Sequence, residues 1–158
     1  EHKRRLASER YGFDAVFNYR EEPAAAALER LAPEGIDGFF DNVGGEQLEA
    51  AIGAMRVGGR IAKCGAISGY NGQPPPGPRN LDLFFGRRLT MRGFLVSDHR
   101  DRRPAFEAAM RAWMEAGDIR ADRRVFSGLD QVGAAFGDLF AGGNVGKTMI
   151  ELGPGAGG

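Results

Sequence analysis

Lys3 and Tyr19 are the first residues along the chain whose types could bind an anion together. Lys3 lies in a highly charged, helix-forming stretch over residues 1–11, and Tyr19 ends the short apolar segment Ala15–Tyr19, which is typical of a strand. An ammonium and a phenol that reach the same phosphate group donate strong, charge-assisted hydrogen bonds to it. The alternative is that Lys3 is a solvated helix charge and that Tyr19 only ends a strand.

A second candidate is the sequence Asp41-Asn42-Val43-Gly44-Gly45, which follows the apolar segment Ile36–Asp41. That segment has the composition of a buried strand, and open α/β sheets bind their ligands at the carboxyl ends of strands. Asp and Asn are also favoured at helix starts, so a turn that caps the next helix accounts for the same residues. Both interpretations can hold together.

A third candidate is Cys64–Asn71, which also stands at the end of a predicted strand, Gly58–Gly65. A lone cysteine is most often a small core residue, so we assign Cys64 no nucleophilic role. Tyr70 is different, because the loop over residues 68–80 is rich in Gly and Pro and places a phenol poorly for a core. Its hydroxyl could donate a hydrogen bond to a ligand oxygen, whereas water could serve equally well as a proton donor.

The composition limits the class of protein. The 21 basic and 21 acidic residues of this 158-residue chain cancel, so nothing attracts it generically to nucleic acid or to an anionic membrane. One cysteine excludes an internal disulfide and suits a reducing compartment. No apolar run reaches the ~18 residues of a spanning helix. His2 and His99 are isolated, and no Cys/His pair has the spacing of zinc ligands. We expect a soluble, cytoplasmic protein with no metal site.

The elements that must position these residues alternate between strands and helices. Apolar residues at helical spacing, bounded by Gly and Pro, predict helices over residues 23–31, 45–55, 106–116 and 129–139. Strands are predicted at Ala15–Tyr19, Ile36–Asp41, Gly58–Gly65, Leu89–Val96, 125–126 and Thr148–Leu152. This alternation is typical of parallel βαβ units. We predict a doubly wound, Rossmann-type α/β sheet as one domain over residues 1–152, with a disordered tail at 153–158.

Such a fold normally begins with a strand, a glycine-rich turn and a helix whose N-terminus holds a pyrophosphate. No such unit precedes Lys3. We therefore expect the chain to be part of a larger protein, and we expect the chain alone to bind a dinucleotide weakly and to be inactive.

Five motifs in the same order resemble one family: Lys3 to Gly12-Phe13-Asp14 and Tyr19, Asp41–Gly45, Cys64–Asn71, Met91–Val96 and Gly143–Lys147. They are similar to the zinc-independent medium-chain dehydrogenase/reductases of the prostaglandin reductase, leukotriene B4 12-hydroxydehydrogenase and alkenal double-bond reductase group. The resemblance runs from Lys3 to about Leu152. It implies an amino-terminal GroES-like domain and the glycine-rich turn upstream of residue 1.

The resemblance assigns roles to individual residues. It implies that Lys3 and Tyr19 bind the adenosine 2′-phosphate, so that the cofactor is NADPH rather than NADH. The other residues that it places beside the cofactor are Asn42, Val43, Cys64, Gly65, Ala66, Ile67, Tyr70, Phe94, Leu95, Val96 and Asn144. Without the resemblance, Phe94–Val96 is an ordinary apolar strand and Asn144 is a turn residue.

The resemblance also implies the reaction. Hydride from NADPH would reach the β-carbon of an α,β-unsaturated aldehyde or ketone, and Tyr70 would orient the nicotinamide or hydrogen-bond the enolate oxygen. It further implies a homodimer that pairs the sheet edge Leu89–Val96 with its copy. One alternative is a quinone oxidoreductase of the same superfamily. Another is a non-catalytic α/β association module, if the native chain starts at residue 1.

Overall fold

The computed structural model describes residues 2–70, 72 and 76–153, so most of the predicted tail lies outside the described residues. The contacts within the chain define two compact units, Phe13–Arg102 and a second made of Glu1–Gly12 with Arg103–Gly158. The prediction of one domain over residues 1–152 remains a prediction. None of the described helices is long and apolar enough to cross a membrane.

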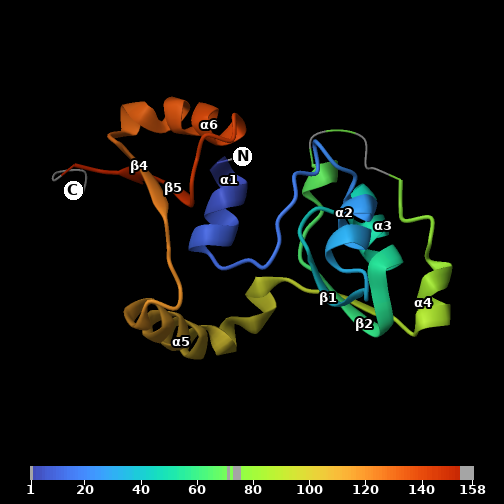
Figure 1. The fold of residues 1–158 in the computed structure, drawn as a ribbon. Helices are drawn as coiled ribbons and strands as arrows, with labels where there is room; N and C mark the ends of the chain where they lie inside the picture. The colour runs from blue at the N-terminus through green and yellow to red at the C-terminus, as the bar shows by residue number, and fades with distance from the viewer. Residues whose placement is uncertain (1, 71, 73–75, 154–158) are drawn as a thin grey trace. The chain divides into compact units, whose positions relative to one another are not determined.

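The unit Phe13–Arg102 is built around a parallel sheet with the strand order β1-β2-β3, of which β1 and β2 are labelled in Figure 1. The strands are β1 (Ile36–Asp41), β2 (Met55–Lys63) and β3 (Thr90–Gly93), and both pairings are parallel. Parallel neighbours need crossover connections. Helix α3 (Gly45–Ala54) supplies the first crossover, and a loop with the helices η2 (Ile67–Gly69) and α4 (Asp82–Arg87) supplies the second. The predicted α/β, Rossmann-like class is confirmed.

Helix α3 covers the sheet and carries much of the core. Its residues Leu48 and Ile52 lie one helical turn apart and are 5% and 0% exposed. They form one cluster with Met55 and Ile61 of β2 and with Leu89, just before β3. Helix α2 (Ala24–Leu31), which follows Pro23 as predicted, packs on α3 and buries Ala27.

Helix α4 was not predicted from the sequence, and it closes the end of α3. The Arg87 guanidinium donates hydrogen bonds of 2.7 Å to the carbonyl of Gly53, in the last turn of α3, and to that of Met55, which follows the helix. These carbonyls need a donor because a helix C-terminus leaves its last carbonyls without intrahelical partners. The chain then leaves α4 through Arg88, which has a left-handed backbone (φ 52°).

The second unit contains α1 (His2–Arg5), a π-helical turn η1 (Leu6–Arg10), α5 (Arg103–Ala116), α6 (Val132–Phe140) and a two-stranded parallel sheet. Its strands are β4 (Arg123–Ser127) and β5 (Lys147–Glu151). Asp122, just before β4, accepts hydrogen bonds of 2.5 Å from Arg10 and from the Tyr11 hydroxyl. This carboxylate ties the amino-terminal segment to the sheet of its own unit.

Two predicted strands need correction. Ala15–Tyr19 is not a strand, because none of the described strands pairs with it through backbone hydrogen bonds. The strand predicted at Leu89–Val96 spans only Thr90–Gly93, and Val96 begins the helical segment η3 (Val96–Arg102). β3 stops at Gly93 because its partner in register, Lys63, is the last residue of β2.

Candidate functional site

A buried carboxylate shapes the turn at the carboxyl end of β1. Asp41 is 0% exposed, and its Oδ1 accepts the N–H groups of Val43 (2.9 Å) and Gly44 (2.8 Å). Its Oδ2 accepts a 2.6 Å hydrogen bond from the ammonium of Lys63, its partner in register on β2. The chain can turn sharply here because Gly44 has a positive φ of 76° before α3 begins.

Opposing effects act on the pKa of Asp41. Burial raises it, whereas the hydrogen bonds from the Lys63 ammonium and from the N–H groups of Gly44 and Val43 lower it. The charge-stabilising contacts prevail, so the pKa of Asp41 lies below its ordinary value and the side chain is a carboxylate at neutral pH.

Hydrogen bonds join this turn to the segment after β2. The Cys64 and Gly65 N–H groups donate to the carbonyl of Asp41 (2.8 and 3.1 Å), and the Ile67 N–H donates to that of Asn42 (3.1 Å). Val43 offers its carbonyl to both the N–H (3.2 Å) and the hydroxyl (2.5 Å) of Ser68. The structure therefore brings together two of the segments that the sequence selected, Asn42–Val43 and 64–70.

The hydroxyl of Tyr70 turns back towards this segment and accepts the Ala66 N–H at 3.4 Å. The tyrosine side chain is still 68% exposed, as expected for a phenol outside the core. Since the oxygen is used as an acceptor, the hydroxyl proton is available for donation to a ligand. Cys64 is exposed, in contrast to the small core residue that we expected.

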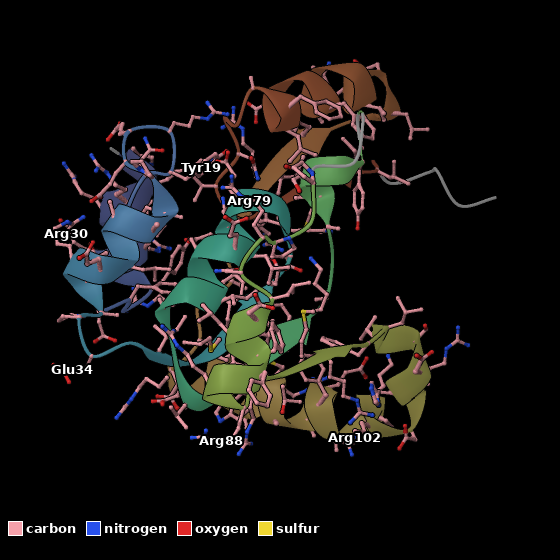
Figure 2. All side chains as sticks on the ribbon, turned by 90° about the vertical axis from the view of Figure 1, so that its right-hand side faces the viewer. Tyr19, Arg30, Glu34, Arg79, Arg88 and Arg102 are labelled. Atoms are coloured by element: carbon pink, nitrogen blue, oxygen red, sulfur yellow. The ribbon has the colours of Figure 1, made fainter. Side chains whose placement is uncertain are left out.

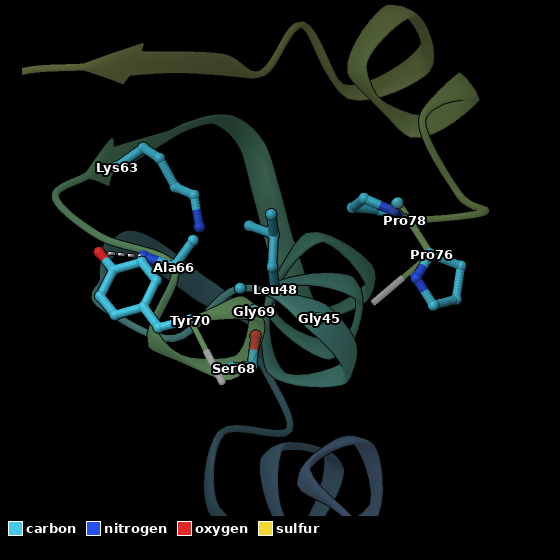
Figure 3. A pocket seen from close by; sticks show the side chains of 11 residues that line it. Gly45, Leu48, Lys63, Ala66, Ser68, Gly69, Tyr70, Pro76 and Pro78 are labelled. Carbon is cyan, nitrogen blue, oxygen red and sulfur yellow. Dashed lines mark hydrogen bonds between the residues drawn. The ribbon is translucent and has the colours of Figure 1, made fainter. Parts of the chain in front are cut away.

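A cavity of about 350 Å³ opens beside the turn (Figure 3). Gly44 and Gly45 line it without side chains, and the Lys63 ammonium lies close to the buried Gly44. Lys63 and Tyr70 enter the same cavity, while Pro78 lies on another side of it. The cavity therefore combines a bare backbone edge with an ammonium and a phenol.

The proline side of the cavity is held by contacts that the sequence did not reveal. Arg79 binds the Glu49 carboxylate of α3 through its guanidinium (3.0 and 3.2 Å) and its backbone N–H (3.1 Å). The Asn80 side-chain amide donates to the Glu49 carbonyl at 2.9 Å. The Arg79 guanidinium lowers the pKa of Glu49. Thirty residues separate the partners, so no local spacing could have indicated the pair. Arg79 is labelled in Figure 2.

Phe94–Val96 reach the same edge of the sheet from the third strand. The Phe94 N–H donates to the Lys63 carbonyl at 3.3 Å, and the Phe94 ring packs edge to face on Phe40 at 6.1 Å between centroids. Leu95 and Val96 follow and are 64% and 81% exposed. Residues predicted for cofactor binding thus follow the carboxyl ends of β1, β2 and β3.

Lys3 and Asn144 line one cavity of about 230 Å³ in the second unit, together with Tyr11. The Asn144 amide donates to the Gly146 carbonyl at 3.1 Å. The hydrogen bond to Asp122 is the main cause that raises the pKa of Tyr11, a lining residue that sequence reasoning missed. Tyr19, labelled in Figure 2, belongs to the other unit, where it is 59% exposed.

Comparison with known proteins identifies the family. Residues 1–114 match the family model described as zinc-binding dehydrogenase, and the chain belongs to this family of the medium-chain dehydrogenase/reductases. The predicted resemblance is therefore confirmed.

Several relatives and solved structures are similar to the chain over most of its length. The chain is 41% identical over 146 residues to dehydrogenase FUB6 of Fusarium oxysporum f. sp. lycopersici, covering 89% of this chain and 41% of that protein. It is 39% identical over 148 residues to the NADP(+)-dependent 2-alkenal reductase of Nicotiana tabacum, covering 93% of this chain and 43% of the relative. Crystalline CurA of Vibrio vulnificus in complex with NADPH is 31% identical, with a TM-score of 0.85 over 98% of this chain and 48% of CurA. The chain thus spans less than half the length of these relatives.

The family description names zinc, and the residues that the structure describes do not fit a zinc site. They contain no group of three or more His, Cys, Asp or Glu side chains placed to hold a metal ion. We assign no step to a metal.

The buried carboxylate makes a first prediction about pH. We expect Asp41→Asn to lower the free energy of unfolding at pH 7 by about 1–3 kcal/mol, because it leaves the Lys63 ammonium without its anion. The folded pKa lies below the unfolded value of ~3.9, so the stabilisation from Asp41 is present above that pH and is lost as the pH falls through the folded pKa. Chemical denaturation at a series of pH values measures both effects.

The control is Asp37→Asn, which changes an exposed carboxylate of the same strand. We expect this variant to unfold like the parent at pH 7, because the contact between Asp37 and Arg56 is exposed. If Asp41→Asn keeps the acid dependence of the parent, the native turn does not depend on an ionised Asp41.

Proposed function

We propose that a protein containing this chain reduces the carbon–carbon double bond of α,β-unsaturated aldehydes or ketones, with NADPH as the hydride donor. The observation that carries the proposal is the convergence of three strand ends on one edge, where Asn42–Val43, 64–70 and Phe94–Val96 are joined through Asp41 and Lys63. The names of relatives, one a 2-alkenal reductase and one crystallised with NADPH, support it.

The residues of this edge line the cavity partly without side chains. Gly44, which is buried, and the half-buried Gly45 belong to the lining, and the hydrogen bonds from Ile67 and Ser68 keep the carbonyls of Asn42 and Val43 in place. NADPH, when bound, would supply the hydride that adds to the β-carbon of the substrate, and a proton from water or another donor at the α-carbon would complete the saturated product. The task of the protein is to hold both partners in a reactive arrangement.

Tyr70 is the residue that we assign to the substrate oxygen. Its oxygen accepts the Ala66 N–H at 3.4 Å, which leaves its own proton available to a ligand. A donor held in advance stabilises the negative charge that develops on the carbonyl oxygen as hydride arrives.

The decisive experiment uses a longer protein that joins this chain to the remainder found in its relatives. We expect it to consume NADPH with 2-alkenals and enones and to return the saturated carbonyl compound. NADPH carrying deuterium at the transferred position should leave the label on the β-carbon, which mass spectrometry and NMR can locate. Turnover of quinones without turnover of any 2-alkenal would replace this proposal with the quinone oxidoreductase alternative.

The cofactor preference gives a separate prediction. We propose that Lys3 and Tyr19 bind the 2′-phosphate that distinguishes NADPH from NADH. In the longer protein, Lys3→Ala combined with Tyr19→Phe should weaken NADPH binding about ten- to a hundredfold, because charge-assisted hydrogen bonds are lost. NADH binding, followed by fluorescence titration, should stay near its parent value. An equal loss for both cofactors contradicts the assignment.

We also propose that two copies pair through the edge strand β3. The strand is exposed over its whole length, Thr90–Gly93, and lies at the end of the order β1-β2-β3. The Phe94 N–H is used by β2, and N–H directions alternate along a strand, so the N–H groups of Met91 and Gly93 point away from the sheet. Such a row of free groups accepts another strand, and a two-fold axis would make the pairing antiparallel.

Sedimentation equilibrium tests the dimer. The parent should sediment as a dimer, whereas Met91→Pro should shift the mass towards the monomer because it removes an outward N–H. Phe85→Ser is the matched control, since it removes an exposed aromatic residue (91% exposed) of helix α4 instead. A monomeric parent, or a Met91→Pro variant that stays dimeric, contradicts pairing through β3.

A further inference from the structure

Lys63 has a place in the site that neither the motifs nor the relatives assign. It is the last residue of β2, its side chain is 26% exposed, and its ammonium lies both in the cavity beside Tyr70 and against the carboxylate of Asp41. Ion pairs of this kind are weak evidence for stability, since removal from water offsets much of the attraction. The position of the pair therefore calls for another explanation.

The contacts form a chain that leads from Lys63 to the ligand edge. The ammonium binds Oδ2 of Asp41, and Oδ1 of the same carboxylate binds the N–H groups of Val43 and Gly44. The carbonyl of Val43 in turn receives both hydrogen bonds of Ser68. A shift of the carboxylate would thus disturb both sides of the edge at once.

We propose that Lys63 is a positioning residue, which acts through Asp41 to hold the Asn42–Gly44 turn in the shape that receives the cofactor. The proposal rests on the function proposed above. The turn needs such support because Gly44 has a positive φ and no side chain with which to fix itself. Without the ammonium, Oδ2 of this buried carboxylate would lose its hydrogen-bond partner, so the carboxylate would hold the two N–H groups less firmly.

Other ionisable groups near the cavity have different partners. Tyr70 uses its oxygen to accept the Ala66 N–H. Glu49 of α3 is bound by Arg79, and Glu46 in the first turn of α3 raises the pKa of Arg79. Among the described residues, Lys63 is the charged side chain that hydrogen-bonds to Asp41.

The first test follows the turn itself by NMR on the ¹⁵N-labelled chain. The amide chemical shifts of Val43 and Gly44 should change with pH as the Asp41 carboxylate is protonated. This change should be absent in Asp41→Asn, which shows that the two amides report on Asp41. In Lys63→Met the midpoint should rise, since the nearby cation is gone. Lys63→Arg should restore the parent midpoint. Arg56→Met, which removes an exposed cation paired with Asp37, should leave it unchanged.

A midpoint that is the same in Lys63→Met and in the parent overturns the proposal. If Lys63→Met does not fold, Lys63→Gln and Lys63→Arg decide in its place. Gln keeps a donor but removes the charge, so the proposal requires a raised midpoint in Gln and a normal one in Arg.

The second test measures NADPH binding by the longer protein. Lys63→Met should weaken binding about tenfold and make it fall further from neutral towards acidic pH, whereas Lys63→Arg should bind like the parent. Unchanged affinity in Lys63→Met overturns the positioning role even if the midpoint of Asp41 moves. A parent that binds no NADPH overturns the function proposed above and, with it, the cofactor as the occupant of the turn. The titration of the Val43 and Gly44 amides does not depend on NADPH binding. A wrong proposal for the function can therefore be distinguished from a wrong proposal for Lys63.

Discussion

The arrangement of the site depends on one buried carboxylate, that of Asp41. Its oxygens satisfy two backbone N–H groups and one ammonium, and its own carbonyl accepts the first two N–H groups after β2. A charge out of contact with water is tolerated only where its partners are complete. The two N–H groups that bind the carboxylate lie in the turn after β1, and the ammonium belongs to the last residue of β2. All the hydrogen bonds of the carboxylate therefore form only when both strand ends are correctly placed.

The parallel order β1-β2-β3 explains why residues far apart in the sequence meet at this carboxylate. Parallel strands all end at the same edge of a sheet, so the segments after Asp41, Lys63 and Gly93 must be neighbours. The core beneath them makes this edge firm, since Ile52 and Met55 are almost completely buried between α3 and the sheet. Stability and site are thus coupled through a single helix, because α3 begins where the turn ends.

The sequence predicts the elements well where local chemistry decides them. Pro23 before α2 and Gly117 after α5 are found where the capping rules place them, and β1 has the predicted bounds. Prediction from the sequence is wrong or incomplete where a residue far away in the sequence determines the local structure. Ala15–Tyr19 has a strand-like composition but no ladder, and the partner of Lys63 is 22 residues away in sequence. The lysine in the otherwise apolar strand indicates that an anion lies nearby. Its partner could be identified only from the register of β1 on β2.

The walls of the cavity beside Gly44 are already held in place, and this bears on binding. The walls beside Gly44 are fixed by hydrogen bonds and lie over the buried cluster of α3 and β2. A preformed site loses less conformational entropy on binding than one that must be ordered. The edge beside Asp41 therefore needs little ordering before a ligand binds there.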